Sequence, residues 1–333
     1  MLYSIVVLVV LFLLELGYLE LAKRKGIIDN PNHRSAHKNP TIRGGGIIYL
    51  PALLLFSFFF KDVAQDYLFL IISVFLVAIV SFIDDINPLS TKVRISIHFL
   101  AFTLIFYCLG FFDVITLSTI FVLLVTLVFS LGYLNIYNFM DGINGMTFLN
   151  ALATLVGFLV INEYVIEFTN SNLVWTYILA TIVFGFFNFR QKPKCFLGDV
   201  GSIAVGFTII YFIIQLFLIS ENYAVFLLLG VYLLDGGWTI LERLVRRENI
   251  FEAHRRHLYQ LFANEIGVSH IKISTVYFLV QLIINSIVVY LLTQSENNLW
   301  MILTLFLILS IIYFLIKKRT YLKIMNKSDK NGI

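Results

Sequence analysis

Charged residues are scarce in this chain of 333 residues. Asp, Glu, Lys and Arg make up 13% of it, whereas hydrophobic residues make up 59% and the mean hydropathy is +0.90. A soluble domain of this length needs far more polar surface to cover its core. The composition therefore excludes a soluble globular protein and predicts one embedded in a lipid bilayer.

Cysteine is also scarce, and its two residues do not form a motif. Cys108 lies in an apolar run, Cys195 lies in a polar loop, and no CxxC pair occurs. This spacing excludes a disulfide framework and a cysteine-based zinc site. Alternating apolar and polar residues, the pattern of a membrane β-barrel, are lacking as well, because the apolar runs are continuous.

The apolar runs predict an all-α, polytopic membrane protein with a single domain over residues 1–333. A membrane-spanning helix needs roughly 17 to 25 apolar residues. Eleven runs of about this length predict eleven transmembrane helices at 2–22, 44–60, 67–83, 93–111, 114–134, 146–161, 173–188, 201–219, 222–241, 272–292 and 298–316.

The basic residues predict the orientation of these helices, because Lys and Arg near spans stay on the cytoplasmic side. With the N-terminus outside, the loops after the first, third, fifth, seventh and ninth spans and the C-terminal tail are cytoplasmic. All 24 lysines and arginines except Lys61 then lie on the cytoplasmic side. The membrane topology therefore explains the excess of Lys and Arg, and no nucleic-acid partner is needed to explain it. The basic face would meet anionic membrane lipids or an anionic substrate.

The chemically rich segments all fall in the predicted cytoplasmic loops. Five loops carry clusters of Asp, Asn, His, Arg and Gly, whereas the external loops are short and plain. We therefore expect one composite site at the inner membrane face. The five segments are DNPNHRSAHKNPTIRGGG (29–46), DDINPLSTKVR (84–94), NIYNFMDGINGM (135–146), RQKPKCFLGDVGS (190–202) and ERLVRRENIFEAHRRHLYQ (242–260).

Two adjacent aspartates, Asp84 and Asp85, end one apolar run. Neighbouring ionised carboxylates repel one another, and metal binding or proton transfer would explain such a pair. Asp141 and Asp199 add two carboxylates at the same membrane level. Hard oxygen donors of this kind suit Mg²⁺, which is usually held by one or two carboxylates together with substrate phosphates. A single carboxylate at a helix end can also simply mark the membrane interface.

Glycines and basic residues extend this cluster toward a phosphorylated ligand. Gly198 and Gly201 flank Asp199 at the start of a span, where free helix N-terminal amides can approach an oxyanion, and the run from Gly44 precedes another span in the same way. Glycines at span starts also serve helix packing. The basic residues of the expected phosphate pocket are Arg34, His37, Arg43, His254, Arg255, Arg256 and His257.

Three further acids lie in or beside predicted spans. Asp235 precedes a Gly-Gly pair inside the ninth span. An acid at this depth indicates either a functional site or a structural pair with a neighbouring arginine. Glu15 and Glu20 are expected to be interface or packing residues.

Four motifs, in order and on one side of the membrane, resemble a known enzyme family. SFIDDINPLSTKVRISIH, NIYNFMDGINGM, CFLGDVGS and EAHRRHLYQ are similar to the motifs of the polyprenyl-phosphate N-acetylhexosamine-1-phosphate transferases, within glycosyltransferase family 4. That family includes the phospho-N-acetylmuramoyl-pentapeptide transferases. The resemblance covers about residues 29–260, and the segment from Asp29 to Gly46 looks most like the branch that starts O-antigen or capsule synthesis.

The resemblance implies an activity in the bacterial plasma membrane. Enzymes of this family use Mg²⁺, which Mn²⁺ could replace, to move a sugar-1-phosphate from a UDP-sugar onto undecaprenyl phosphate, and UMP is released. It implies catalytic roles for Asp84 and Asp85, with Asp84 activating the lipid phosphate. Asp199 and Asp85 match metal-site positions.

The same resemblance implies a nucleotide-sugar site and leaves some roles open. Arg34, His37 and Asp235 are accessory candidates, and a homodimer is left open. The residues matched to nucleotide-sugar binding are Arg43, Asn135, Asn138, Asp141, Asn144, His254, Arg255, Arg256 and His257.

Two positions depart from the family pattern. Asn144 stands where the family usually has a second aspartate, and an amide holds no charge. Arg255 and Arg256 stand between His254 and His257, which keeps positive charge for a diphosphate but removes a general acid.

Two alternatives compete with a transferase. A transporter of an organic anion or of a polyprenyl-linked sugar would place polar groups near the bilayer midplane, but here they crowd the predicted cytoplasmic rim, and inverted repeats are not evident. An inactive scaffold would not need the intact aspartates. Within the transferase hypothesis, we favour direct attack by the lipid phosphate over a covalent aspartate intermediate.

Overall fold

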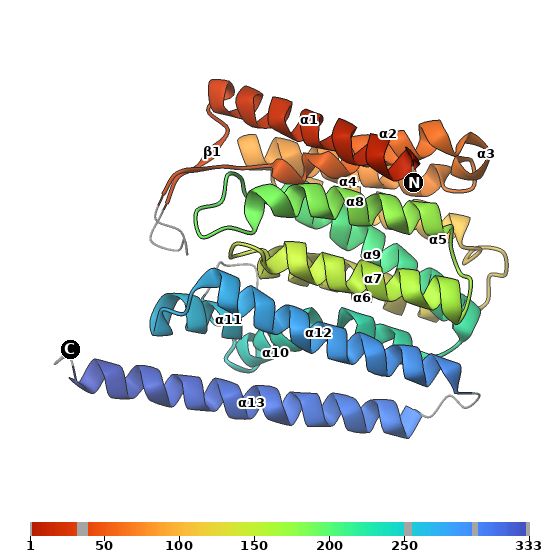
Figure 1. Cartoon of the computed structure of the whole chain (residues 1–333). Helices are drawn as coiled ribbons and strands as arrows, with labels where there is room; N and C mark the ends of the chain where they lie inside the picture. The colour runs from red at the N-terminus through yellow and green to blue at the C-terminus, as the bar shows by residue number, and fades with distance from the viewer. Residues whose placement is uncertain (1, 32–38, 250–254, 295–298, 331–333) are drawn as a thin grey trace.

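The protein forms a bundle of long helices that run side by side, with its N- and C-termini at opposite ends (Figure 1). The structure is a computed structural model, and it describes residues 2–31, 39–249, 255–294 and 299–330. The helices are α1 (Leu2–Lys25), α2 (Tyr49–Phe59), α3 (Lys61–Ala64), α4 (Leu68–Ile86), α5 (Thr91–Cys108), α6 (Leu117–Met140), α7 (Met146–Tyr164), α8 (Ser171–Asn188), α9 (Gly198–Ser220), α10 (Gly230–Val245), α11 (Leu258–Gln260), α12 (His270–Thr293) and α13 (Leu299–Lys330).

The remaining elements are short. An antiparallel pair of two-residue strands, β1 (Ile28–Asp29) and β2 (Thr41–Ile42), follows α1. Two 3₁₀ turns, η1 (Gly45–Ile48) and η2 (Tyr223–Leu229), precede α2 and α10, and a π-helical turn, η3 (Leu261–Ile266), follows α11.

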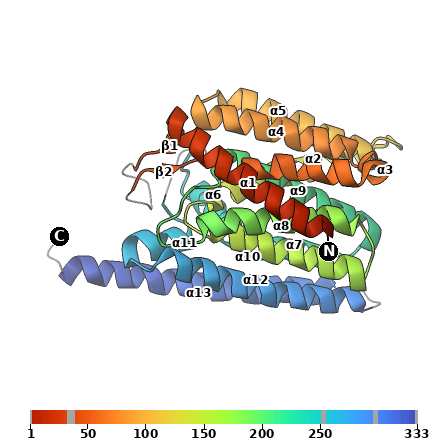
Figure 2. The same ribbon diagram turned by 45° about the horizontal axis from the view of Figure 1, so that its top comes forward.

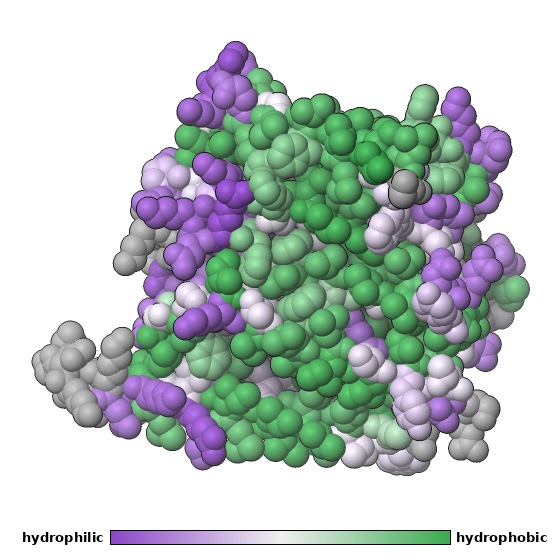
Figure 3. All heavy atoms as spheres, in the orientation of Figure 1, coloured by the Kyte–Doolittle hydropathy of each residue, from purple (hydrophilic) through white to green (hydrophobic). Residues whose placement is uncertain are grey.

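The prediction of an all-α polytopic membrane protein is confirmed. In the described part of the chain, ten helices are long and apolar enough to cross a membrane. The remaining predicted span, 44–60, forms a shorter apolar helix over Gly45–Phe59, whose first turn is the 3₁₀ segment η1. An apolar belt crosses the middle of the bundle, and polar residues gather at its two ends (Figure 3).

One predicted span, 222–241, is broken within the membrane. It begins as η2 and continues as α10 after Gly230, where the regular backbone hydrogen bonds are interrupted. The side chain of Gln281 on α12 repairs the break: its amide nitrogen donates to the carbonyl of Leu228 at 3.1 Å, and its oxygen accepts from the amide of Val231 at 3.0 Å. A backbone break inside a bilayer is tolerated when a neighbouring helix satisfies the freed groups in this way.

Helix α9 forms the centre of the bundle and α13 forms its edge. α9 is buried along most of its length and packs against α4, α6 and η1. α13 lies at the margin of the bundle in both ribbon views (Figures 1 and 2). We call the end of the bundle where α1, α4, α6 and α10 end and α9 begins the site end.

Candidate active site

The adjacent aspartates at the end of α4 point to different partners. Successive side chains on a helix diverge by about 100°. Asp84 accepts a hydrogen bond from the amide of Leu89 at 2.6 Å. It also forms an ion pair with Arg94, whose Nη1 lies 2.9 Å away. Ser90 caps the start of α5 through the amide of Val93, which places Arg94 one turn into that helix. Asp84 therefore closes the α4–α5 turn.

Asp85 turns the other way, toward the segment before η1 and the start of α9. Its Oδ1 lies 3.3 Å from Nη1 of Arg43, and the carboxyl group is almost fully buried. It also accepts hydrogen bonds from the amides of Val200, at 3.4 Å, and Asp199. Each member of the Asp84–Asp85 pair thus has its own arginine, and this relieves the repulsion between them.

The glycines of the two motifs bring Arg43 and Asp199 together. The backbone of residues 42–46 runs along residues 195–197: Gly45 N donates to Phe196 O and Gly46 N donates to Leu197 O, both at 2.9 Å. A Cβ on Gly198, whose φ is +74°, would lie 2.7 Å from Asp85 Oδ2 and 2.9 Å from Gly44 Cα. Close approach of two backbones requires glycine here.

This geometry corrects one expectation about the glycine motifs. The amides of Gly45 and Gly46 were expected to be open to an oxyanion, but they donate to carbonyl oxygens. The amides at the start of α9 do meet an anion, and that anion is the carboxylate of Asp85. The favourable interaction of a helix N-terminus with negative charge is therefore used inside the protein.

Residues at the end of α6 complete the cluster from a third side. Asn138 hydrogen bonds to Asp199, and its Oδ1 accepts from the hydroxyl of Ser202 at 2.6 Å. Asp141 follows α6, is half-buried and hydrogen bonds to Thr147. Asn135, one turn earlier, is exposed and donates to the carbonyl of Leu131, so it does not reach Asp199 through these contacts.

The electrostatics of the site centre on one arginine. Arg43 forms an ion pair with Asp85 at 3.3 Å, and its charge also acts at longer range on Asp29, Asp199 and Asp141. Withdrawal from water is the largest effect on Asp141 and raises the pKa of its carboxyl to about 7, against the hydrogen bond from Thr147, which lowers it. Arginine is the side chain best suited to binding and orienting a phosphate group, and Arg43 lies at the end of the bundle where these carboxylates gather.

Asn144 is a structural brace of the loop after α6. Its side-chain nitrogen donates to the carbonyl of Arg190 at 3.0 Å, and the next amide, Gly145 N, donates to Asn188 Oδ1 at 2.7 Å. A carboxylate could not donate the first of these bonds. The departure from the family pattern therefore has a local physical reason.

The histidine-rich loop returns to the bundle beside α10. Arg256 pairs with Glu248 at 2.7 Å and with Glu242 at 3.4 Å, and His257 is buried 3.7 Å from Asp235. Arg255 is half-buried. The accessory candidates Arg34 and His37, and the predicted nucleotide-sugar residue His254, lie outside the described residues.

The oxygen donors of the site are of the kind that Mg²⁺ accepts, although they do not form a complete metal cage. Among the described residues, no group of three or more His, Cys, Asp or Glu side chains is arranged to hold a metal ion. Two carboxylates, Asp85 and Asp199, stand close together around Arg43. A site of this kind fits a cation that takes its remaining ligands from water and substrate phosphates. Metal binding by these residues stays a prediction.

Sequence reasoning missed several supporting residues. Arg94 was quoted in a motif but given no role, although it pairs with Asp84. Tyr18 donates to the carbonyl of Arg43 at 2.5 Å, and the Cys195 thiol lies 3.5 Å from Glu15, which is fully buried. Glu15 and Tyr18 share one face of α1, a signal that their spacing of three residues contained.

Comparison with known proteins gives the same assignment as the motifs. The model of the family described as glycosyl transferase family 4 matches residues 67–217. This range holds Asp84, Asp85, Asp141 and Asp199, which the structure gathers at one end of the bundle. Residues 67–217 of this chain are therefore similar to a glycosyl transferase family 4 domain.

Two relatives illustrate the range of this similarity. The chain is 26% identical over 317 residues to the "Probable undecaprenyl-phosphate N-acetylglucosaminyl 1-phosphate transferase" of Bacillus subtilis, covering 89% of this chain and 84% of the relative. It is 32% identical over 201 residues to a phospho-N-acetylmuramoyl-pentapeptide-transferase of Streptococcus pneumoniae, covering 54% of this chain. It spans 60% of the length of that second relative.

Proposed function

We propose that this protein transfers a sugar-1-phosphate from a UDP-N-acetylhexosamine to undecaprenyl phosphate and releases UMP. The observation that carries the proposal is the Arg43–Asp85 ion pair, with Asp199 and Asp141 in the same electrostatic cluster, at the polar end of an apolar bundle. A lipid-borne acceptor and a water-soluble donor can meet only at such a rim. The names of both relatives describe transferases of phosphorylated sugars.

In the proposed reaction, an oxygen of the lipid phosphate attacks the phosphorus that bears the sugar. A bond forms between them, and the bond from that phosphorus to the oxygen bridging to the nucleoside phosphate breaks. UMP leaves with the electron pair, and a lipid diphosphate sugar remains. Phosphoryl transfer of this type depends on in-line positioning and on charge neutralisation. The acceptor phosphate is already an oxyanion, so no covalent aspartate intermediate is needed.

The residues divide these tasks. Asp84, held between the Leu89 amide and Arg94, would orient the lipid phosphate or accept its proton. Arg43 would lie against the diphosphate, together with the basic residues of the loop that contains Arg255 and Arg256. Asp199 and Asp85 would hold Mg²⁺, which when bound supplies positive charge to the diphosphate oxygens.

Orientation and pathway are parts of the same proposal. The distribution of Lys and Arg supports a site end that faces the cytosol, with the N-terminus outside. UDP-sugars are cytosolic, so this orientation places donor and site in one compartment. The segment before η1 supports a role in starting O-antigen or capsule synthesis in a bacterial plasma membrane.

Release of UMP tests this proposal directly. Purified protein would be incubated with undecaprenyl phosphate, Mg²⁺ and a panel of nucleotide-sugars, with chelator and acceptor-free reactions as controls. We expect UMP only with a UDP-N-acetylhexosamine, and only when both acceptor and metal are present. Release from a non-UDP donor would overturn the donor assignment, and UMP without acceptor would indicate hydrolysis instead of transfer.

A further inference from the structure

A buried carboxylate outside the aspartate cluster, Asp235, gathers hydrogen bonds from several segments at the site end. Asp235 on α10 is 1% exposed and accepts five hydrogen bonds, one of them from Thr239 of its own helix at 3.5 Å. Two come from consecutive amides, Leu258 N at 2.8 Å and Tyr259 N at 3.3 Å. Two come from hydroxyls of other helices, Tyr277 of α12 at 2.8 Å and Tyr313 of α13 at 3.1 Å. A buried carboxylate is costly unless it is satisfied in this way.

Tyr259 links Asp235 to the loop that contains Asp141. The amide of Tyr259 donates to Asp235, and the hydroxyl of Tyr259 donates to the carbonyl of Phe139 at 2.8 Å. The same hydroxyl lies against Gly142, where no Cβ could be accommodated. Phe139 and Gly142 flank Asp141 in the chain, so the Tyr259 hydroxyl touches the turn on both sides of that carboxyl.

A second set of contacts runs from α13 toward the loop of residues 255–260. Lys317 Nζ lies 2.9 Å from Glu242 Oε2, and the other oxygen of Glu242 lies 3.4 Å from Arg256 Nη1. Arg256 is three residues before Tyr259. Helix α13 is therefore linked to the loop of residues 255–260 through Glu242 and Asp235 of α10.

We propose that Asp235 is a positioning residue for the transfer reaction: through Tyr259 it fixes the Phe139–Gly142 turn and so sets the place of Asp141 against Arg43. Asp235 itself does not touch substrate. This inference rests on the proposed function, because its kinetic consequence appears only in an active transferase.

The competing explanation is that Asp235 only satisfies buried donors and stabilises the fold. The chain offers a matched control for that explanation. Asn162, near the end of α7 at the opposite end of the bundle, also accepts two consecutive amides with one side-chain oxygen, Phe168 N and Thr169 N, both at 2.9 Å. Loss of Asn162 removes the same kind of anchor far from the site.

A double-mutant cycle tests the proposed route. The variants are Asp235→Asn, Tyr259→Phe and the two combined, with Asn162→Ala as the control. UMP release is measured per amount of monodisperse folded protein. We expect Asp235→Asn and Tyr259→Phe each to lower kcat by about tenfold, in line with the loss of one buried hydrogen bond. The double variant should be little worse than the worse single one, and Asn162→Ala should stay within about twofold of the parent.

Other outcomes would overturn the inference. Parental kcat in folded Asp235→Asn would show that Asp235 has only a structural role. If the losses of the two single variants multiplied in the double variant, Asp235 would not act through Tyr259. Tyr259→Phe keeps the test decisive if Asp235→Asn does not fold.

Hydrogen exchange separates this inference from the proposed function. The amides of residues 258 and 259 should exchange faster in Asp235→Asn than in the parent, whether or not the parent is active. Unchanged exchange would refute the anchor itself. A parent that releases no UMP from any donor would instead refute the proposed function.

Discussion

The two ends of the bundle are built from the same residue types but use charge differently. At the opposite end, neutral side chains cap and link the loops: Thr116 and Thr119 form a capping box, Asn170 accepts from the amide of Asn172, and the hydroxyl of Tyr67 accepts from the amide of Asn170. At the site end, Asp85 contacts Arg43 and Val200, which are 42 and 115 residues away. Local capping needs only local sequence, whereas a site requires the whole fold.

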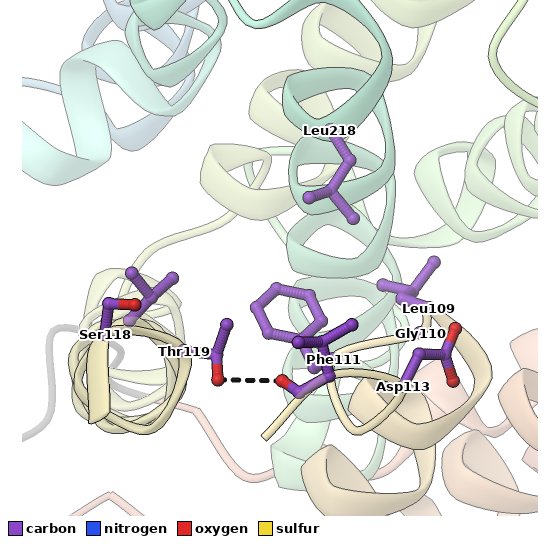
Figure 4. A pocket seen from close by; sticks show the side chains of 9 residues that line it. Leu109, Gly110, Phe111, Asp113, Ser118, Thr119 and Leu218 are labelled. Carbon is purple, nitrogen blue, oxygen red and sulfur yellow. Dashed lines mark hydrogen bonds between the residues drawn. The ribbon is translucent and has the colours of Figure 1, made fainter. Parts of the chain in front are cut away.

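A cavity of about 280 Å³ at the opposite end lies between the α5–α6 connection and the end of α9 (Figure 4). Its lining is mainly apolar, with one carboxylate from Asp113, and Thr119 donates across it to the carbonyl of Val114 at 2.8 Å. There is no clustering of charge from distant segments at this cavity.

Removal of the central cation should give the largest difference between the two ends. Arg43→Ala removes the ion-pair partner of the buried Asp85 carboxylate, and truncation of one partner of a buried charge pair costs about 2 to 5 kcal/mol. We expect UMP release to fall about 100-fold or more. Arg24→Ala, which removes an exposed pair with Glu20, is the control and should change the rate less than twofold. Near-parental activity in Arg43→Ala would show that the cluster is not the site.

Neutralising single carboxylates should separate their proposed roles. Asp199→Asn is expected to need much more Mg²⁺, with partial recovery at high Mg²⁺ or with Mn²⁺, because the amide loses the charge that attracts the ion. Asp84→Asn should turn over slowly at every metal concentration. A Mg²⁺ titration of UMP release checks both variants, and superimposable metal curves for Asp199→Asn and the parent would end the metal assignment.

A pair of glycine substitutions should measure the crowding at the site end. Gly198→Ala must adopt φ +74° and also meets Asp85 and Gly44, whereas Gly267→Ala must adopt φ +85° with no neighbour within 4 Å. A positive φ costs an alanine about 1 to 2 kcal/mol, and overpacking adds about 1 to 3 kcal/mol. Thermal unfolding in detergent should therefore show the larger loss for Gly198→Ala. Equal losses would contradict the close approach of the two backbones.

The smallest effects should come from two helix caps, one at each end of the bundle. Ser90→Ala and Asn170→Ala each remove one capping bond, worth about 1 kcal/mol of stability. We expect similar shifts in unfolding temperature. Only Ser90→Ala should also reduce kcat, by a fewfold, because Ser90 begins the helix that carries Arg94 to Asp84. If both caps affected kcat alike, the distinction between the ends would fail.

The sequence predicted the fold class and the loops of the site because hydropathy and chain order are local properties. Continuous apolar runs locate the helices, and the short helix Gly45–Phe59 and the break at Gly230 are the main departures. The four aspartates were identified by their positions at span ends. Their assignment to one end of the bundle follows from counting spans.

The partners of these residues could not be predicted in the same way. Which arginine meets Asp85 depends on how the backbone beside Arg43 aligns with the segment before Asp199, and no local pattern encodes that alignment. Asp235 shows the limit most clearly. Its expected structural partner was an arginine, but amides and tyrosine hydroxyls from three separate segments surround it.

The backbone ladder between residues 42–46 and 195–197 also has a consequence for how the protein responds to bilayer thickness. Its hydrogen bonds join the start of α2 to the start of α9, so these helices cannot slide past one another along the membrane normal. A bilayer that is too thin or too thick must then be accommodated by tilt of loosely packed helices such as α13, or by the lipid itself. The depth of the carboxylate cluster relative to α2 and α9 therefore stays fixed, and it is the lipid surface that must adjust to the enzyme.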